Sequence, residues 1–181
     1  MDMNSCAFPT HSGLIVDLER PTPDMIDPDD IAWALAHTLR YGGHSNQPIT
    51  VANHSIEDAN HVAYATADAD LVRAGLLHDA AEAYLGDVIR PLKRMMPEYG
   101  RIETEFEWVI GKRFDIDPAL FSCETVKHAD MVVYSLERRD IGPTAWDVLP
   151  DDELPSCGHT NRSIGDSYTD FTDLMLQFRL T

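Results

Sequence analysis

A short stretch between Leu76 and Asp87 concentrates the side chains best suited to chemistry. It holds adjacent His78 and Asp79, and then Glu82, directly behind an apolar run. A buried imidazole and a buried carboxylate are both costly unless they are paired or bound to a metal. Adjacent side chains leave a helix about 100° apart, so one ion between them can reach both. Glu82 lies over the same patch of helix surface. This stretch alone leaves two interpretations open, a metal site and an ordinary surface hydrogen bond.

Two further polar residues favour the metal site. His54 lies in an apolar segment, and Asp130 interrupts an otherwise apolar helical pattern. Each has a simpler explanation, because His54 can be a hydrogen-bonded core histidine and Asp130 can pair with an arginine. Together with His78 and Asp79 they supply two imidazoles and two carboxylates from three predicted helices. Such a mixed set suits one divalent ion (Mn²⁺, Co²⁺, Fe²⁺, Zn²⁺ or Mg²⁺) and leaves positions open for water and substrate. Metal sites in helical bundles are built from facing helices in this way.

The elements that must position these residues are predicted to be helices. Asp27, Thr50 and Asp68 are N-cap residues, and Pro97 and Pro118 are typical of helix starts. The predicted helices span about 29–39, 51–66, 69–84, 98–114, 119–138 and 167–179. An irregular arm with a β-hairpin edge covers 1–28, and a long loop with an acidic patch at 151–153 covers 141–166. The expected fold class is all-α, as one domain over 1–181 with its core at about 29–140.

Composition and charge narrow the classes of function. The chain has 181 residues, 44% hydrophobic content and a formal net charge of -17. So acidic a chain repels nucleic acid polymers and anionic membranes, although locally focused cations can still bind a small phosphate ester. No apolar run has the length of a membrane span, and the N-terminus does not have the pattern of a signal peptide. Three scattered cysteines indicate free thiols, so we expect a cytoplasmic protein without a cysteine-ligated zinc site.

The order of the candidate ligands, H…HD…D, resembles the signature of the HD-domain metal-dependent phosphohydrolases. The similarity covers about 29–140 and is carried by further residues at fitting distances. These are Arg40-Tyr41, His54, His78-Asp79-Ala80-Ala81-Glu82, Gly86-Asp87, Pro91, Lys93, and Lys127 three residues before Asp130. With them, the sequence is most similar to the 5'-deoxynucleotidase branch. Within this branch, the sequence is most similar in overall character to prophage and phage members, which include phage enzymes that remove triphosphate from dATP.

This resemblance implies a helical bundle around a single metal ion, often in a homo-oligomer. It implies that His54, His78, Asp79 and Asp130 bind the ion, which polarises a phosphate oxygen and activates a water. Glu82 would orient or deprotonate that water, and Asp87 would assist the leaving oxygen or hold the sugar. Arg40, Lys93 and Lys127 would stabilise phosphoryl charge, and Tyr41 would stack on the base or sugar. Each of these side chains also has a purely structural interpretation, as a helix-end charge, an exposed residue or an ion pair.

Three functions stay open on the sequence. The first is hydrolysis of deoxynucleotides, as a dNMP 5'-phosphatase or as a dNTP (dATP) triphosphohydrolase. The second is hydrolysis of a cyclic or signalling nucleotide, which needs ligands for a second metal, and only His44, His61 and His128 are nearby candidates. The third is a non-catalytic helical module whose metal is structural. The expected partner is a small deoxynucleotide, with no nucleic acid polymer and no membrane.

Overall fold

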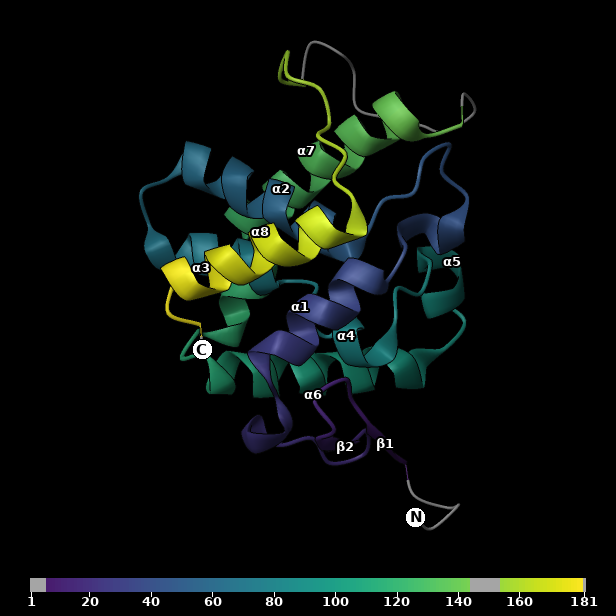
Figure 1. The fold of residues 1–181 in the computed structure, drawn as a ribbon, viewed down its shortest axis with the longest axis vertical. Helices are drawn as coiled ribbons and strands as arrows, with labels where there is room; N and C mark the ends of the chain where they lie inside the picture. The colour runs from purple at the N-terminus through teal and green to yellow at the C-terminus, as the bar shows by residue number, and fades with distance from the viewer. Residues whose placement is uncertain (1–5, 144–153, 181) are drawn as a thin grey trace.

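The chain folds as an all-α protein, as the sequence predicts (Figure 1). The computed structural model describes residues 6–143 and 154–180, so the predicted acidic patch at 151–153 lies outside the described residues. The α-helices are α1 Pro28–His37, α2 Val51–Ala65, α3 Ala69–Leu77, α4 Glu82–Leu85, α5 Arg90–Lys93, α6 Pro97–Arg113, α7 Glu124–Ile141 and α8 Ile164–Gln177. Short 3-10 helices lie at η1 Pro23–Met25, η2 Arg40–Gly43 and η3 Pro118–Ser122. Within the described ranges, no helix combines the length and apolar character needed to cross a bilayer.

The predicted N-caps and the hairpin are present. The Asp27 side chain accepts hydrogen bonds from the first turn of α1, Thr50 caps α2 and Asp68 caps α3. Each cap satisfies backbone N–H groups that have no partner inside the helix, which fixes where the helix begins. In the N-terminal arm, strands β1 (Ala7–Pro9) and β2 (Ile15–Asp17) pair antiparallel, as expected for the hairpin edge.

Two helices that the sequence predicts as continuous are each divided into two shorter helical segments. The helix expected over 69–84 ends at Leu77, and a tight turn over 78–81 separates α3 from α4. Hydrogen bonds in this turn span three residues, as from Glu82 N–H to the Asp79 carbonyl, so the chain tightens where the His-Asp pair lies. The helix expected over 119–138 begins instead as η3, and α7 starts only after Cys123, whose backbone is extended.

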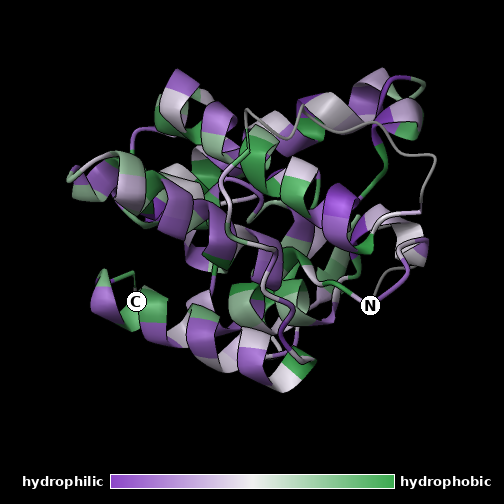
Figure 2. Cartoon of the chain, turned by 90° about the horizontal axis from the view of Figure 1, so that it is seen from above, coloured by the Kyte–Doolittle hydropathy of each residue, from purple (hydrophilic) through white to green (hydrophobic). Residues whose placement is uncertain are grey.

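Helix α2 lies at the centre of the bundle and packs against α3, α7 and α8, while α1 and α8 lie side by side (Figure 1). Green apolar and purple polar residues alternate along the helices in Figure 2, as expected for helices with one buried face. The core includes Ile31, Leu35, Leu76, Phe106 and Phe171, all fully buried. This core packs around α2, α7 and the turn that follows α3, which carry the candidate ligands.

Two glycines of α6 give a prediction about stability. A Cβ atom at Gly111 would lie 2.8 Å from the Ile116 carbonyl oxygen and 2.8 Å from Pro118 Cγ, whereas one at Gly100 would meet nothing within 4 Å. We expect Gly111→Ala to lower the free energy of unfolding by roughly 1–3 kcal/mol, because the segment after α6 must move away. Gly100→Ala, on the exposed face, should raise it by up to about 1 kcal/mol. Urea denaturation of both variants checks this, and equal effects would contradict the tight contact at Gly111.

Candidate metal centre and adjoining pocket

Side chains from α2, α7 and the turn after α3 converge on one point. His54 Nε2 lies 3.3 Å from Asp130 Oδ1 and 3.7 Å from Asp79 Oδ2, and His78 Nε2 lies 3.3 Å from the same Asp79 oxygen. The structure therefore brings together all four residues that the sequence singles out as ligands. His54 is fully buried, and Asp79 and Asp130 are about a quarter exposed.

A fifth residue, Asp58, completes the cluster and was missed from the sequence. It follows His54 by one turn of α2, and its Oδ2 lies 3.1 Å from His78 Nε2 and 3.3 Å from His54 Nε2. Ligand atoms of His54, Asp58, His78 and Asp130 all lie within 4.8 Å of one another. This His/Asp cluster can hold a metal ion. The four-residue spacing from His54 was the signal available in the sequence, because it places both side chains on one helix face.

The hydrogen bonds of both imidazoles orient their Nε2 atoms for ligation. His54 Nδ1 lies 2.8 Å from Glu137 Oε1, and His78 Nδ1 lies 2.8 Å from the Gly75 carbonyl oxygen. A carbonyl and an ionised carboxylate only accept hydrogen bonds, so each Nδ1 carries the proton. In the neutral ring Nε2 then carries the lone pair, and it points toward the cluster. Metal-binding histidines are commonly fixed in this way.

The cluster fits a cation because several of its buried atoms have no hydrogen-bond partner among the described residues. These atoms are both carboxylate oxygens of Asp58 and the Nε2 atoms of His54 and His78. Burial raises the pKa of Asp58 to about 7, against the attraction of the two imidazoles. Burial disfavours a charged His78, but Asp79 and Asp58 outweigh it and raise its pKa to about 10. A divalent cation would replace the protons that otherwise hold these groups together.

A pocket of about 480 Å³ adjoins the cluster and shares Asp79 and Asp130 with it. Five of the six predicted catalytic and substrate-binding residues line this pocket, and Lys127 does not. The lining comprises Arg40, Tyr41, His44, Asp79, Glu82, Asp87, Val88, Ile89, Arg90, Pro91, Lys93, Asp130, Tyr134 and Arg138. Arg90, Tyr134 and Arg138 were not predicted to contact substrate. Lys127 is exposed on α7 and lies outside the lining.

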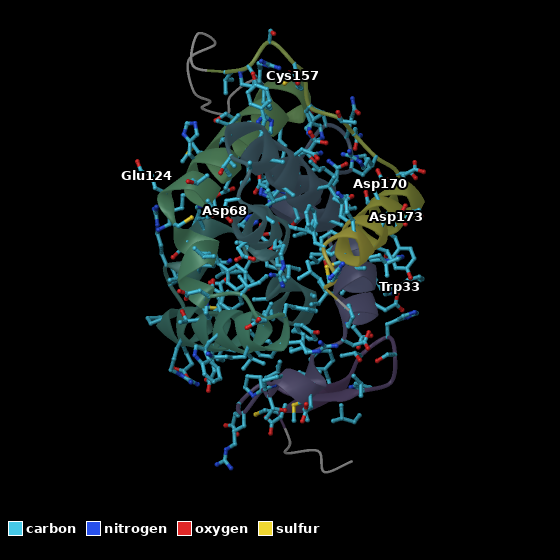
Figure 3. All side chains as sticks on the ribbon, turned by 90° about the vertical axis from the view of Figure 1, so that its left-hand side faces the viewer. Trp33, Asp68, Glu124, Cys157, Asp170 and Asp173 are labelled. Atoms are coloured by element: carbon cyan, nitrogen blue, oxygen red, sulfur yellow. The ribbon has the colours of Figure 1, made fainter. Side chains whose placement is uncertain are left out.

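Cations gather in this pocket although the chain is strongly acidic. The Arg90 guanidinium lies over the Tyr134 ring, 5.5 Å from its centroid, and Arg40 Nη1 donates to Asp79 Oδ2 at 3.4 Å. By contrast, Figure 3 labels Asp68, Glu124, Asp170 and Asp173 on the face that it shows, and all four are exposed. Four cations, Arg40, Arg90, Lys93 and Arg138, thus line the pocket beside four carboxylates, and a bound metal ion would add the positive charge that attracts a small anion.

Glu82 is the carboxylate best placed to exchange a proton in the pocket. It is only 6% exposed, its Oε1 accepts from Lys93 Nζ at 3.3 Å, and its Oε2 has no partner among the described residues. Burial, reinforced by Asp79 and Asp87, raises the pKa of Glu82 to about 8. Lys93 is held in turn by Glu103, whose Oε1 lies 2.5 Å from Nζ. A carboxyl group with a pKa near neutrality suits general acid–base catalysis.

The turn before α2 is strained and held by two carboxylates. Tyr41 has a φ of 59°, an uncommon value for a residue with a side chain. Its N–H donates to Asp87 Oδ2 at 3.1 Å, and its hydroxyl donates to Glu137 Oε2 at 2.5 Å. Asp87 therefore shapes the pocket as well as lining it. Glu137, two turns after Asp130 on α7, was not identified from the sequence.

Comparison with known proteins gives relatives but no activity. No protein-family model matches the chain. It is 33% identical over 143 residues to "Uncharacterized protein YfdR" of Escherichia coli K12, covering 77% of this chain and 76% of that protein. It is also 33% identical over 142 residues to an uncharacterized protein of Rhodobacter capsulatus, covering 72% of this chain and 70% of that protein. The chain therefore belongs to the same protein family as YfdR of Escherichia coli.

Proposed function

We propose that this protein is a divalent-metal-dependent phosphohydrolase of the HD-domain type that acts on deoxynucleotides. One observation carries the proposal: a buried His/Asp cluster from three segments adjoins a cation-lined pocket that also holds a carboxyl group of raised pKa. A purely structural metal would need the cluster but not the pocket. The H…HD…D order of the ligands supports the same class.

The ligands fit a single ion with a preference for oxygen and imidazole donors. His54 and His78 offer Nε2, and Asp58, Asp79 and Asp130 offer carboxylate oxygens. Three carboxylates favour Mn²⁺, Fe²⁺, Co²⁺ or Mg²⁺ over Zn²⁺, which more often takes four ligands. Bound there, the ion supplies a Lewis acid for a phosphate oxygen and makes a nearby water more acidic.

The chain's own residues then carry out the proton transfers and hold the phosphate. Glu82 accepts a proton from the attacking water, whose oxygen forms a bond to phosphorus as the bond from phosphorus to the 5' oxygen breaks. The departing 5' oxygen takes up a proton and becomes the sugar hydroxyl, and Asp87 assists this departure or holds the sugar. Arg40 and Lys93 neutralise the phosphoryl oxygens through charged hydrogen bonds. The same bond breaks whether a monophosphate or a triphosphate is released.

The pocket favours a nucleotide over a simple phosphate ester. Tyr41 and Tyr134, with ring centroids 6.1 Å apart, both line it and can contact a base or sugar. Arg90, whose Nη2 lies 3.7 Å from Asp130 Oδ2, and Arg138 give two further cations in the pocket, which suits a substrate with more than one phosphate. Hydrolysis of a signalling nucleotide at two metals has less support, because the described residues give one ligand group and it contains none of His44, His61 and His128.

A substrate panel tests the proposal. Purified protein is incubated with each deoxynucleoside mono- and triphosphate and with Mn²⁺, Co²⁺, Mg²⁺ or Zn²⁺ in turn, and products are separated by chromatography. We expect a deoxynucleoside together with phosphate or tripolyphosphate, and complete loss of product with a chelator. Ribonucleotides and cyclic nucleotides serve as comparison substrates. Metal binding without turnover of any deoxynucleotide would overturn the proposal. Light scattering of the same sample tests the expected homo-oligomer.

A further inference from the structure

Glu137 is a buried charge that connects the cluster with the pocket. Its side chain is 0% exposed, and it accepts hydrogen bonds from Arg40 Nε at 3.2 Å, the Tyr41 hydroxyl at 2.5 Å and His54 Nδ1 at 2.8 Å. It does not line the pocket and is not among the ligand atoms of the cluster. A carboxylate so completely buried persists only when it is fully paired. All of its partners belong to the candidate site.

The contact with His54 decides which ring nitrogen faces the cluster. Neutral imidazole has one protonated and one unprotonated nitrogen, and an acceptor at Nδ1 places the proton there. The Nε2 lone pair is then free for a cation beside Asp58 and Asp130. A donor in the place of Glu137 would reverse the tautomer and direct an N–H at the cation.

The other contacts hold the turn that carries Arg40 and Tyr41. The positive φ of Tyr41 is stabilised from its N–H by Asp87 and from its hydroxyl by Glu137. Arg40 spans from Glu137 to Asp79 through Nε and Nη1. One carboxylate therefore fixes a candidate ligand on α2 and two pocket residues on the preceding turn.

We propose that Glu137 is a positioning residue that sets the ligating nitrogen of His54 and holds the Arg40-Tyr41 turn in place for substrate. The role of Glu137 toward the Arg40-Tyr41 turn rests on the proposed function. Its role toward His54 requires only that the cluster binds a metal ion. It assigns to Glu137 no contact with substrate or metal. Its effect passes through His54, Arg40 and Tyr41.

Glu137→Gln tests the proposal because the glutamine amide has only one oxygen. It cannot accept hydrogen bonds both from Arg40 and Tyr41 and from His54 Nδ1 as the two carboxylate oxygens do. Arg40 is an obligatory donor, and leaving a buried guanidinium unpaired costs more than changing a histidine tautomer. The amide oxygen should therefore turn to Arg40 and Tyr41, and the amide NH₂ to His54 Nδ1. Nε2 of His54 then carries the proton, and we expect Co²⁺ affinity to fall by about 10- to 100-fold.

The experiment titrates the variant with Co²⁺ alone and follows the visible absorption of the ion, which also reports its ligands. Asp30→Asn is the matched control, because Asp30 is a buried carboxylate held by Thr10 and Ser12 away from the pocket. We expect this control to lose stability but to bind Co²⁺ like the unmodified protein. Unchanged Co²⁺ affinity and spectrum in Glu137→Gln would overturn the proposal.

A measurement on the unmodified chain does not depend on whether the variant folds. In the Zn²⁺-loaded protein, long-range ¹H–¹⁵N spectra should show the proton of His54 on Nδ1 and the metal on Nε2. Metal on Nδ1 would overturn the proposal. If the unmodified protein binds metal with this tautomer but hydrolyses no nucleotide, the proposed function fails and the role of Glu137 toward His54 stands. If it binds no metal, both fail.

Discussion

Replacing Asp58 by asparagine is expected to weaken metal binding by more than about 100-fold without destabilising the metal-free protein. Asp58 is fully buried, and neither of its carboxylate oxygens has a hydrogen-bond partner among the described residues. Its Oδ2 faces the two imidazoles, 3.1 Å from His78 Nε2 and 3.3 Å from His54 Nε2, where a cation would gain a negative ligand. Because burial raises the pKa of Asp58 despite these imidazoles, a neutral side chain of the same shape should be tolerated in the metal-free protein. Asparagine removes a negative ligand at nearly constant volume. Substituting a residue that only hydrogen-bonds to a metal ligand typically lowers metal affinity by about 10- to 100-fold. Loss of a ligand itself should therefore lower it by more than about 100-fold.

Two measurements separate this outcome from simple misfolding. Thermal unfolding without metal should give an equal or higher midpoint for Asp58→Asn, whereas added Mn²⁺ or Co²⁺ should raise the midpoint of the unmodified protein only. Glu57→Gln is the matched control, since Glu57 is the adjacent carboxylate on α2 and pairs with Arg162 rather than with the cluster. If Asp58→Asn keeps full metal affinity, Asp58 is not a ligand and the cluster is reduced to the four residues expected from the sequence.

The sequence predicted the fold class and the identities of the four convergent residues because both depend on local rules. Asp27, Thr50 and Asp68 fix helix starts because their side chains accept backbone hydrogen bonds, and these residue types can be recognised in the sequence. Polar residues on apolar helix faces, such as His54 and Asp130, stand out because burial makes them costly. The same rule applies to Asp58, which lies on the buried face of α2 one turn after His54.

What the sequence could not give depends on contacts between distant segments. Glu137 lies near the end of a helix rich in charged residues, and only the fold shows that its face is buried against Arg40 and His54. The break of the helix at 78–81 has no proline or glycine to announce it. The turn at Tyr41 depends on Asp87, 46 residues away, for one of its hydrogen bonds. Long-range partners of this kind have no signature in local spacing.

The division between cluster and pocket explains why a strongly acidic chain can still act on an anionic substrate. The carboxylates of the cluster would be compensated by a cation, and in the rest of the pocket four cations, Arg40, Arg90, Lys93 and Arg138, outnumber the carboxylates Glu82 and Asp87. Of these, Arg40 and Arg90 also form ion pairs with carboxylates of the cluster. Substrate phosphate would therefore meet positive charge on both sides, although the formal net charge of the chain is -17. Raising the ionic strength should weaken substrate binding for the same reason.

Replacing Glu82 by glutamine is expected to lower kcat by about 10²- to 10⁴-fold, the usual contribution of a general base. Only the ionised form accepts a proton, so activity of the unmodified enzyme should rise as the pH passes upward through the pKa of Glu82. Burial places that pKa at about 8, and the positive charge of a bound ion would move the midpoint lower. The residual activity of Glu82→Gln should lack this rise.

The stability of the same variant should change in the opposite direction from its activity. Because the pKa of Glu82 is raised on folding, the folded state binds more protons than the unfolded state above about pH 4.5, and stability contributed by this group falls as the pH rises toward about 8. Glutamine removes that loss, so Glu82→Gln should be at least as stable as the unmodified protein at pH 8 to 9.

Glu107→Gln is the matched control, because burial also raises the pKa of Glu107 but its side chain does not line the pocket. A pH–rate profile that keeps its rise in Glu82→Gln, or loses it in Glu107→Gln, would assign the proton transfer to another group and leave Glu82 as a partner of Lys93 alone.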